Sequence, residues 1–225
     1  MNEEGEAQLR IEDVLARFAA ADVPGRRTAP VDPASSGRVR GDHDLSPELY
    51  EPHRPLKAAA VLVPIVDRSQ GPQVLLTRRT DHLHDHAGQI SFPGGRIDPG
   101  DETPEAAALR ETEEEIGLPP TKVRLVGRLD TYIVRTGFEV HPVVGLVRPP
   151  FDLALDSFEV AEVFEVPLAF FLRPGAKERH SRIFRGRERF FYAYPYGDHY
   201  IWGATAGMLG NLVEFLDPRH AEAGE

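Results

Sequence analysis

A short helix rich in carboxylates is the feature that most restricts how this chain can fold. Its sequence, TPEAAALRETEEEIG, begins at Thr103 and ends at Gly117. Thr103 is a favoured N-cap residue, Pro104 suits the first helical position, and glycine commonly ends a helix. At 100° per residue, one side of this helix is apolar and should face a hydrophobic core. That side consists of Leu109, Thr112 and Ile116.

The other side of the helix gathers three carboxylates, those of Glu111, Glu114 and Glu115. Arg110 can pair with Glu114 four residues later, but Glu111 and Glu115 are also four apart, and like charges at that spacing cost about 0.2–0.5 kcal/mol. A solvated acidic face is the simplest interpretation, yet this face lacks interspersed lysines. A hard divalent cation would remove the repulsion, because Mg²⁺ takes oxygen ligands from one or two carboxylates and from substrate phosphates. The pattern therefore favours a magnesium site over a solvated face.

Composition narrows the classes of function. The formal net charge of -10 argues against a broad nucleic-acid surface, which needs clustered Lys and Arg. The chain has no cysteine, which excludes disulfides, thiolate zinc sites and cysteine nucleophiles. Its N-terminus is acidic and polar, unlike a secretory signal, and no apolar run approaches the roughly 20 residues of a membrane span. We therefore expect a cytoplasmic protein that acts on a small molecule, without nucleic-acid or membrane partners.

Hydrophobic patterns predict the rest of the fold. Strand-like segments lie at 58–66, 73–79 and 138–147, and helical spacing predicts helices at 7–20 and 202–216. This order predicts an α/β (α+β) fold in which a mixed β-sheet is covered by helices on both faces. Large aromatic side chains dominate cores, so the tryptophan before the last helix should pack in the core or dock that helix rather than stack on a base. The expected hairpin turns contain Gly137 and Gly186, and the tryptophan is Trp202.

The same pattern divides the chain into three parts. Residues 1–55 are expected to form an N-terminal helix and an irregular arm rich in Pro, Gly, Arg and Asp, 56–216 a single domain, and 217–225 a C-terminal tail. Two roles stay open for the arm, which either covers the active site or builds a homodimer.

The acidic helix resembles the signature of the Nudix hydrolase family. That signature is a glycine, five residues, Glu, seven residues and then Arg-Glu-apolar-x-Glu-Glu-x-Gly-apolar, and this chain has Glu102, seven residues and RETEEEIGL. It departs at two points, because Gly95 lies one residue further upstream and Thr112 replaces the apolar residue. The longer loop leaves Glu102 and Asp101 as alternatives for the leading acid. The matching residues are Arg110, Glu111, Glu114, Glu115, Gly117 and Leu118.

The resemblance implies a Nudix-type α/β/α sandwich that hydrolyses a diphosphate linked to another group. It implies that Glu111 and Glu115 ligate Mg²⁺ or Mn²⁺ directly and that the carbonyl of Gly95 adds a ligand. It also implies that Glu114 assists catalysis or bridges to a second ion, and that Arg110 orients the carboxylates.

The general base that accepts a proton from the attacking water is not fixed by the signature. The segment DSFEVAEVFEVPL offers Glu159, Glu162 and Glu165, in a place where related enzymes bring in one more Glu. Each of these is equally well explained as an exposed surface acid, since Asp and Glu are mostly exposed. Glu159 is favoured as the base, and Glu162 is the alternative.

The segment before the helix, LLTRRTDHLHDHAGQISFPGG, collects basic residues in an otherwise acidic chain. It resembles the signature of the coenzyme A pyrophosphatase branch of the Nudix family, Leu-Leu-Thr-x-Arg-Ser-x-x-Leu-Arg-x-His-x-Gly before Phe-Pro-Gly-Gly. Thr80 replaces Ser and His84 replaces Arg. The resemblance implies that coenzyme A and water give 3′,5′-ADP and 4′-phosphopantetheine. The residues predicted to bind this substrate are Arg78, Arg79, His86 and Arg96.

Three other interpretations stay open. The histidines at 82, 84 and 86 are either incidental surface residues or a transition-metal cluster, although the absence of cysteine and the neighbouring acids favour a hard ion. The substrate is otherwise another diphosphate, such as ADP-ribose or a nucleoside triphosphate. A silent module that senses a nucleotide is disfavoured, because a domain that only binds has no need to keep carboxylates that repel one another.

Overall fold

The fold is built on one mixed β-sheet, seen in a computed structural model that describes residues 9–21, 39–47, 55–82, 87–184 and 186–222. The strand order is β1-β7-β8-β2-β3-β4, with β5 paired to β2, β6 to β8 and β9 to β3. The pairs β2/β8 and β1/β7 are parallel, and the others are antiparallel. The strands are β1 (Arg40–Gly41), β2 (Lys57–Arg68), β3 (Gly71–Arg79), β4 (Ile90–Ser91), β5 (Gly94–Arg96), β6 (Val123–Arg128), β7 (Tyr132–Val134), β8 (Phe138–Val147) and β9 (Val160–Pro167).

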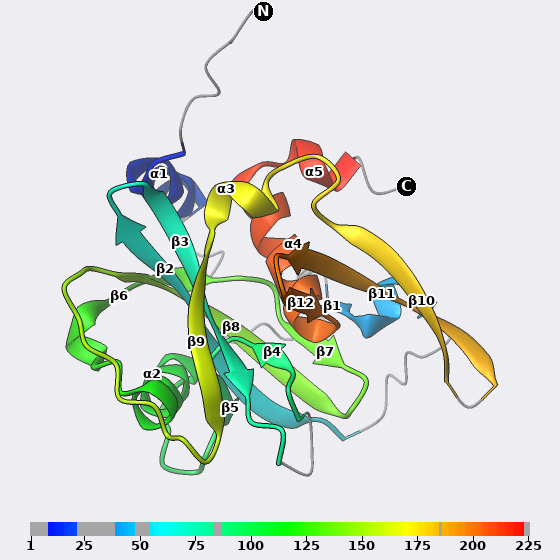
Figure 1. Ribbon diagram of the computed structural model, residues 1–225, viewed down its shortest axis with the longest axis horizontal. Coiled ribbons are helices and arrows are strands. Elements are labelled where there is room, and N and C mark those ends of the chain that lie inside the picture. Colours follow the sequence, from blue (N-terminus) through cyan, green and yellow to red (C-terminus); the bar gives the residue numbers. More distant parts are fainter. Residues whose placement is uncertain (1–8, 22–38, 48–54, 83–86, 185, 223–225) are drawn as a thin grey trace, which may run out of the picture.

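Helices cover both faces of this sheet, which confirms the predicted α/β/α sandwich. Alternate residues of β2 enter two separate cores: Val63 and Ile65 pack with α1 and α4, while Leu62 and Val66 pack with α2. Figure 1 shows α2 on the left of the main sheet and α4 on its right. The helices are α1 (Ile11–Ala21), α2 (Pro104–Ile116), α3 (Leu168–Phe171), α4 (Ala204–Leu216) and α5 (Arg219–Glu222), with 3-10 turns η1 (Asp42–Asp44) and η3 (Pro120–Lys122).

A smaller antiparallel sheet lies beside α4 and consists of β10 (Glu178–Phe184), β11 (Arg187–Tyr196) and β12 (His199–Trp202) (Figure 1). The hairpin turns predicted at two glycines are confirmed, since Gly137 joins β7 to β8 and Gly186 joins β10 to β11, both with positive φ. In the described part of the arm, β1 adds to the edge of the main sheet beside β7. The division of the chain at residues 55 and 216 stays a prediction.

The predicted helix around the carboxylates is confirmed with both of its ends. The Thr103 hydroxyl accepts a hydrogen bond from the N–H of Ala106 at 3.2 Å, and Gly117 ends the helix with a φ of 69°. Thr112 packs in the core as expected, and its hydroxyl donates to the Ala108 carbonyl at 2.6 Å. Glu115 was expected on the acidic side of the helix that faces away from the core, but it is only 8% exposed. It follows Thr112 by three residues and precedes Ile116, so it lies at the margin of the buried side.

Among the described residues, no helix is both long enough and apolar enough to cross a membrane.

Candidate active site

Arg110 ties the loop before α2 to the acids of the helix. Its Nε and Nη2 donate to the Asp101 carboxylate at 3.0 and 2.9 Å, and Nη1 donates to Glu111 and Glu114, both at 3.0 Å. Nη2 also donates to the Arg96 carbonyl at 3.1 Å. The hydrogen bonds from Arg110 hold the pKa of Asp101 below its ordinary value. Of the two alternatives for the leading acid, Asp101 is therefore the one in contact with the helix.

The carboxylate of Glu111 lies against the backbone of Gly95. A Cβ added to Gly95 would lie 2.5 Å from Glu111 Cδ, so the Glu111 carboxylate would have to move away. Partial burial raises the pKa of Glu111, against the effect of its hydrogen bond from Arg110. Glycine at this position therefore leaves the space that the carboxylate occupies.

Glu115 is held beside the same turn. Its Oε2 accepts a hydrogen bond from the N–H of Gly94 at 3.2 Å, and its Oε1 lies 3.8 Å from Arg79 Nη1. Burial raises the pKa of Glu115 to about 7, and the nearby charges of Glu159 and Glu111 act in the same direction. Desolvation and like charge thus combine on one carboxyl group, which is the environment that often marks a functional acid.

Glu159 approaches this group from the loop before β9. Its Oε2 lies 3.5 Å from Arg79 Nη2, so Arg79 reaches both Glu115 and Glu159. Thr80 holds the loop in place, because its N–H donates to the Glu159 carbonyl at 3.0 Å and its hydroxyl donates to the Phe158 carbonyl at 2.7 Å. The role of Thr80 was not evident in the sequence, since its partner lies 78 residues away and only the folded chain brings the two together.

Arg78 and Glu162 lie apart from this group. Arg78 Nε donates to Glu162 at 2.9 Å, and His199 contacts the same carboxylate at 3.2 Å while its ring stacks on Phe164 at 3.7 Å. Hydrogen bonding from Arg78 lowers the pKa of Glu162. Phe164 packs against the core beneath α4, which places this pair on the α4 face of the sheet. The structure therefore brings Glu159, and not Glu162, to the Nudix-like helix.

The remaining predicted site residues are spread more widely. The Arg96 side chain is exposed and its guanidinium lies 5.8 Å from the centre of the Phe138 ring. Glu114 is exposed at the outer side of α2, where Arg110 contacts it. His86, together with His84, lies outside the described residues. The residues that converge are Gly94, Gly95, Arg79, Arg110, Glu111, Glu115 and Glu159.

Comparison with known proteins identifies the family to which this chain belongs. A family model for the NUDIX domain matches residues 56–185. The chain is 41% identical over 169 residues to the "Uncharacterized Nudix hydrolase NudL" of Escherichia coli (strain K12), an alignment that covers 75% of this chain and 88% of that protein.

Similar solved structures are more distant in sequence. The MutT protein from Methanosarcina mazei Go1 is 20% identical with a TM-score of 0.46, covering 78% of this chain and 100% of that chain. The NUDIX domain of Shewanella oneidensis NrtR, solved with ADP ribose, is 20% identical with a TM-score of 0.44, covering 76% of this chain and 93% of that chain. From the matched domain and the identity to its relatives, the chain belongs to the Nudix family and is a Nudix hydrolase.

Proposed function

We propose that this Nudix hydrolase cleaves the diphosphate of coenzyme A or of a coenzyme A derivative. The observation that carries the proposal is the position of Arg79, whose guanidinium lies 3.8 Å from Glu115 and 3.5 Å from Glu159. At these distances Arg79 forms ion pairs with the two carboxylates, and its planar guanidinium is suited to donate hydrogen bonds to phosphate oxygens when a diphosphate enters. Arg79 also belongs to the sequence segment that resembles the coenzyme A branch.

The residues around Glu111 and Glu115 fit a hard divalent cation. Both carboxylates are desolvated, and they repel one another, which raises the pKa of Glu115 further. The room left by Gly95 places a backbone next to the Glu111 carboxylate. Within the described parts of the chain, no three His, Asp or Glu side chains gather closely enough to enclose an ion. The two carboxylates of Glu111 and Glu115 suit Mg²⁺ or Mn²⁺, because such ions keep several waters and need only one or two carboxylates besides substrate phosphates.

In this proposal Glu111, Glu115 and the Gly95 carbonyl would hold the ion, and Glu114 would serve a second ion from its exposed position. A bound ion of this kind polarises a phosphoryl oxygen and lowers the pKa of a bound water. Arg110 keeps Glu111 and Glu114 oriented through its two hydrogen bonds of 3.0 Å.

Glu159 is the proposed general base. It lies across Arg79 from Glu115, where its carboxylate can take a proton from water that attacks the diphosphate. Arg79 then binds the phosphate oxygens and stabilises the charge that develops on them. The alternative base, Glu162, is engaged by Arg78 and His199 on the α4 face.

Substrate choice is tested with purified protein, Mg²⁺ or Mn²⁺, and a panel of coenzyme A, ADP-ribose, NADH and dATP, with products identified by mass spectrometry. We expect preferential formation of 3′,5′-ADP and 4′-phosphopantetheine. Preferential cleavage of another substrate would keep the active site and overturn the coenzyme A assignment. No cleavage of any substrate would favour a silent nucleotide-sensing module.

The base is tested in the same assay with two matched variants. Glu159→Gln should reduce kcat by about 100-fold, the usual contribution of a positioned base, while Glu162→Gln should have a much smaller effect. Equal losses in the two variants would contradict the assignment of Glu159.

A further inference from the structure

We propose that a cavity on the α4 face of the molecule binds an adenine nucleotide. The cavity has a volume of about 220 Å³ and lies between β1, η1, β7, the small sheet β10–β12 and α4. Its wall includes Tyr132, a member of the core that α4 covers, whereas α2 packs on the other core. The cavity is therefore on the opposite side of the main sheet from the helix that carries Glu111 and Glu115.

A buried amide without partners is the first observation that points to a ligand. Asn211 of α4 lines the cavity and is 6% exposed, yet within the part of the chain that the structure describes neither its Nδ2 nor its Oδ1 has a hydrogen-bond partner. A buried polar group left in that state costs about 1–3 kcal/mol, so its presence calls for an explanation. A ligand that offers an acceptor next to a donor would satisfy both atoms of the amide.

The walls of the cavity are aromatic. Phe191 and Trp202 line it with ring centres 5.3 Å apart in an edge-on arrangement. Tyr192 lines it as well, with the Lys177 ammonium 4.7 Å from the centre of its ring. Such surfaces favour a flat ring over a flexible chain, because aromatic rings gain from stacked and edge contacts with one another.

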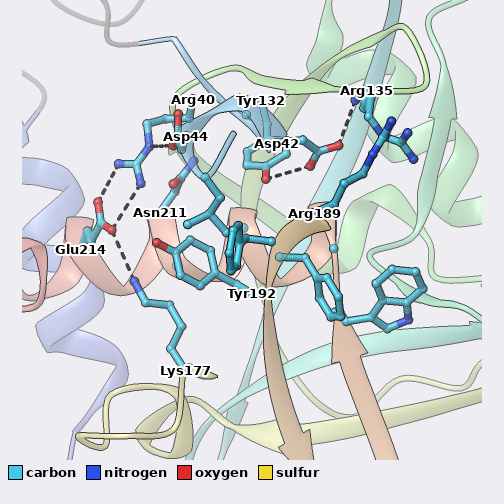
Figure 2. A pocket seen from close by; sticks show the side chains of 18 of the residues that line it. Arg40, Asp42, Asp44, Tyr132, Arg135, Lys177, Arg189, Tyr192, Asn211 and Glu214 are labelled. Atoms are coloured by element: carbon cyan, nitrogen blue, oxygen red, sulfur yellow. Dashed lines mark hydrogen bonds and ion pairs between the residues drawn. The ribbon is translucent and has the colours of Figure 1, made fainter. Parts of the chain in front are cut away.

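The charges around the cavity are arranged unevenly. Figure 2 shows Arg40, Asp44 and Glu214 at one end, and Arg135 and Arg189 at the other. At the first end the charges satisfy one another, since Arg40 donates to Asp44 at 2.8 Å and to Glu214 at 2.6 Å.

The other end gathers basic side chains in a chain whose formal net charge is -10. Arg182 and Arg189 line the cavity and pair with each other across the small sheet. Asp42 at this end (Figure 2) accepts hydrogen bonds from the Tyr132 hydroxyl at 3.1 Å and the Arg135 N–H at 2.9 Å. An anionic group is thus favoured at the Arg182 and Arg189 end.

Adenine nucleotides combine these three properties. The adenine N6 amino group and N7 form an adjacent donor and acceptor, which an asparagine amide contacts with two hydrogen bonds. The base is flat, and the attached phosphate provides the negative charge. Guanine presents two acceptors at the same edge, so its match to Asn211 is poorer.

The chain provides its own reporter for this binding, because Trp202 is the single tryptophan and lines the cavity. Titration of the full-length protein with AMP, without divalent ions, should change the tryptophan fluorescence saturably, and GMP should bind at least about tenfold more weakly, as the loss of a paired base contact predicts. A wild-type signal that does not saturate up to millimolar AMP would overturn the proposal.

Asn211→Leu is the decisive variant, because leucine keeps the shape of the amide and removes its polar atoms. Without ligand its melting temperature should equal or exceed that of the wild type, since a buried unsatisfied group is lost. Its affinity for AMP should fall by at least about tenfold, the loss expected for two hydrogen bonds. Arg182→Gln should weaken binding and its salt dependence, while the exposed Arg124→Gln on β6 serves as the matched control.

The variant Glu115→Gln distinguishes AMP binding in the cavity from AMP binding in the catalytic site. AMP binding that persists in Glu115→Gln and fails in Asn211→Leu supports the proposal, and the reverse pattern overturns it by placing AMP in the catalytic site. The ligand is therefore a free adenine nucleotide and not the adenosine end of a substrate, whose base is joined through one ribose to the diphosphate. If the proposed function holds, the KM for coenzyme A should stay unchanged in Asn211→Leu, and a raised KM would contradict the separation of the two sites.

Discussion

Arg79 reaches from β3 to the buried end of α2, where its Nη1 lies 3.8 Å from Glu115 Oε1. The other amino group of the same guanidinium lies 3.5 Å from Glu159 Oε2. The neighbouring Arg78 pairs with Glu162 instead, on the opposite face of the strand. The pairing of β3 with β9 shifts in register between Arg78 and Arg79. Because successive residues of a strand point to opposite faces, the two adjacent arginines are directed to different sides of the sheet.

Replacing Arg79 should therefore impair catalysis more than replacing Arg78. We expect Arg79→Gln to lower kcat/KM by about 100-fold, the usual loss when a donor to a charged transition state is removed, and Arg78→Gln to lower it far less. Steady-state kinetics on the best diphosphate substrate measure both, with the exposed Arg124→Gln as the control. A larger loss in Arg78→Gln would contradict the position proposed for the substrate.

Glu115→Gln should raise the stability of the protein and abolish its activity. Burial raises the pKa of this carboxyl to about 7, so at pH 8 the wild type carries a desolvated charge that glutamine lacks. We expect a higher melting temperature for the variant at pH 8, together with a loss of turnover and of the stabilisation by Mn²⁺ that a ligand of the folded state provides. The exposed Glu113→Gln on the same helix is the matched control for both measurements. Mn²⁺ stabilisation equal to the wild type would refute the proposed role of Glu115.

Two glycines of the same loop give a sharp test of the space beside Glu111. A methyl group on Gly95 would collide with the Glu111 carboxylate, whereas one on Gly100 would meet nothing within 4 Å. Gly95→Ala should reduce kcat by at least about tenfold, because a displaced group near the chemistry loses its productive geometry. Gly100→Ala should behave as wild type in the same turnover assay. Full activity in Gly95→Ala would show that Glu111 need not remain in its present place.

Thr80 should act as a positioning residue for Glu159. Thr80→Val removes the hydroxyl that donates to the Phe158 carbonyl at 2.7 Å, while Thr80→Ser retains it. Since the loop would lose a buried hydrogen bond worth about 1 kcal/mol, we expect kcat to fall in Thr80→Val with little change in KM. Rescue by Thr80→Ser in the same kinetic assay separates positioning from simple packing. Equal losses of kcat in both variants would argue against a role of the Thr80 hydroxyl in positioning Glu159.

Local sequence signals predicted the elements of this fold well. Thr103, Pro104 and Gly117 define the ends of α2 through contacts within one or two turns, so they could be recognised without the rest of the chain. Gly137 and Gly186 mark hairpins for a similar reason, because positive φ angles favour glycine in tight turns.

The candidate site could be predicted only in part. Alternation along a regular strand would place Arg78 and Arg79 on opposite faces, but which face meets Glu115 depends on pairing with β9, more than 80 residues later in the chain. The burial of Glu115 likewise depends on Gly94 and Arg79.

The cavity beside Asn211 had no sequence signal at all. It is formed by residues from β1, β7, the small sheet and α4, which only the complete fold brings together. Trp202, expected in the core or at the last helix, is half-buried and lines this cavity.

Asp42 should give the protein a pH-dependent stability. Burial raises the pKa of this carboxyl from 3.8 to about 6, against the opposing hydrogen bond from Tyr132. Between about pH 4 and pH 6 the folded protein therefore holds a proton that the unfolded chain releases, and the free energy of unfolding falls as the pH rises. At 1.36 kcal/mol per pKa unit the loss amounts to about 3 kcal/mol and is complete above pH 6.

Asp42→Asn isolates this effect, because the amide does not titrate. Its single oxygen can replace only one of the two carboxylate oxygens that accept from the Tyr132 hydroxyl and the Arg135 N–H, and the cost of that loss changes little with pH above pH 6. Urea unfolding at pH 4, 5, 6 and 7 should show the variant gaining on the wild type as the pH rises to 6, with a constant difference above it. The exposed Asp198→Asn in the turn before β12 is the control and should follow the wild type. A difference between Asp42→Asn and the wild type that is the same at pH 4 and pH 7 would mean that the Asp42 carboxyl is already ionised in the folded protein at pH 4.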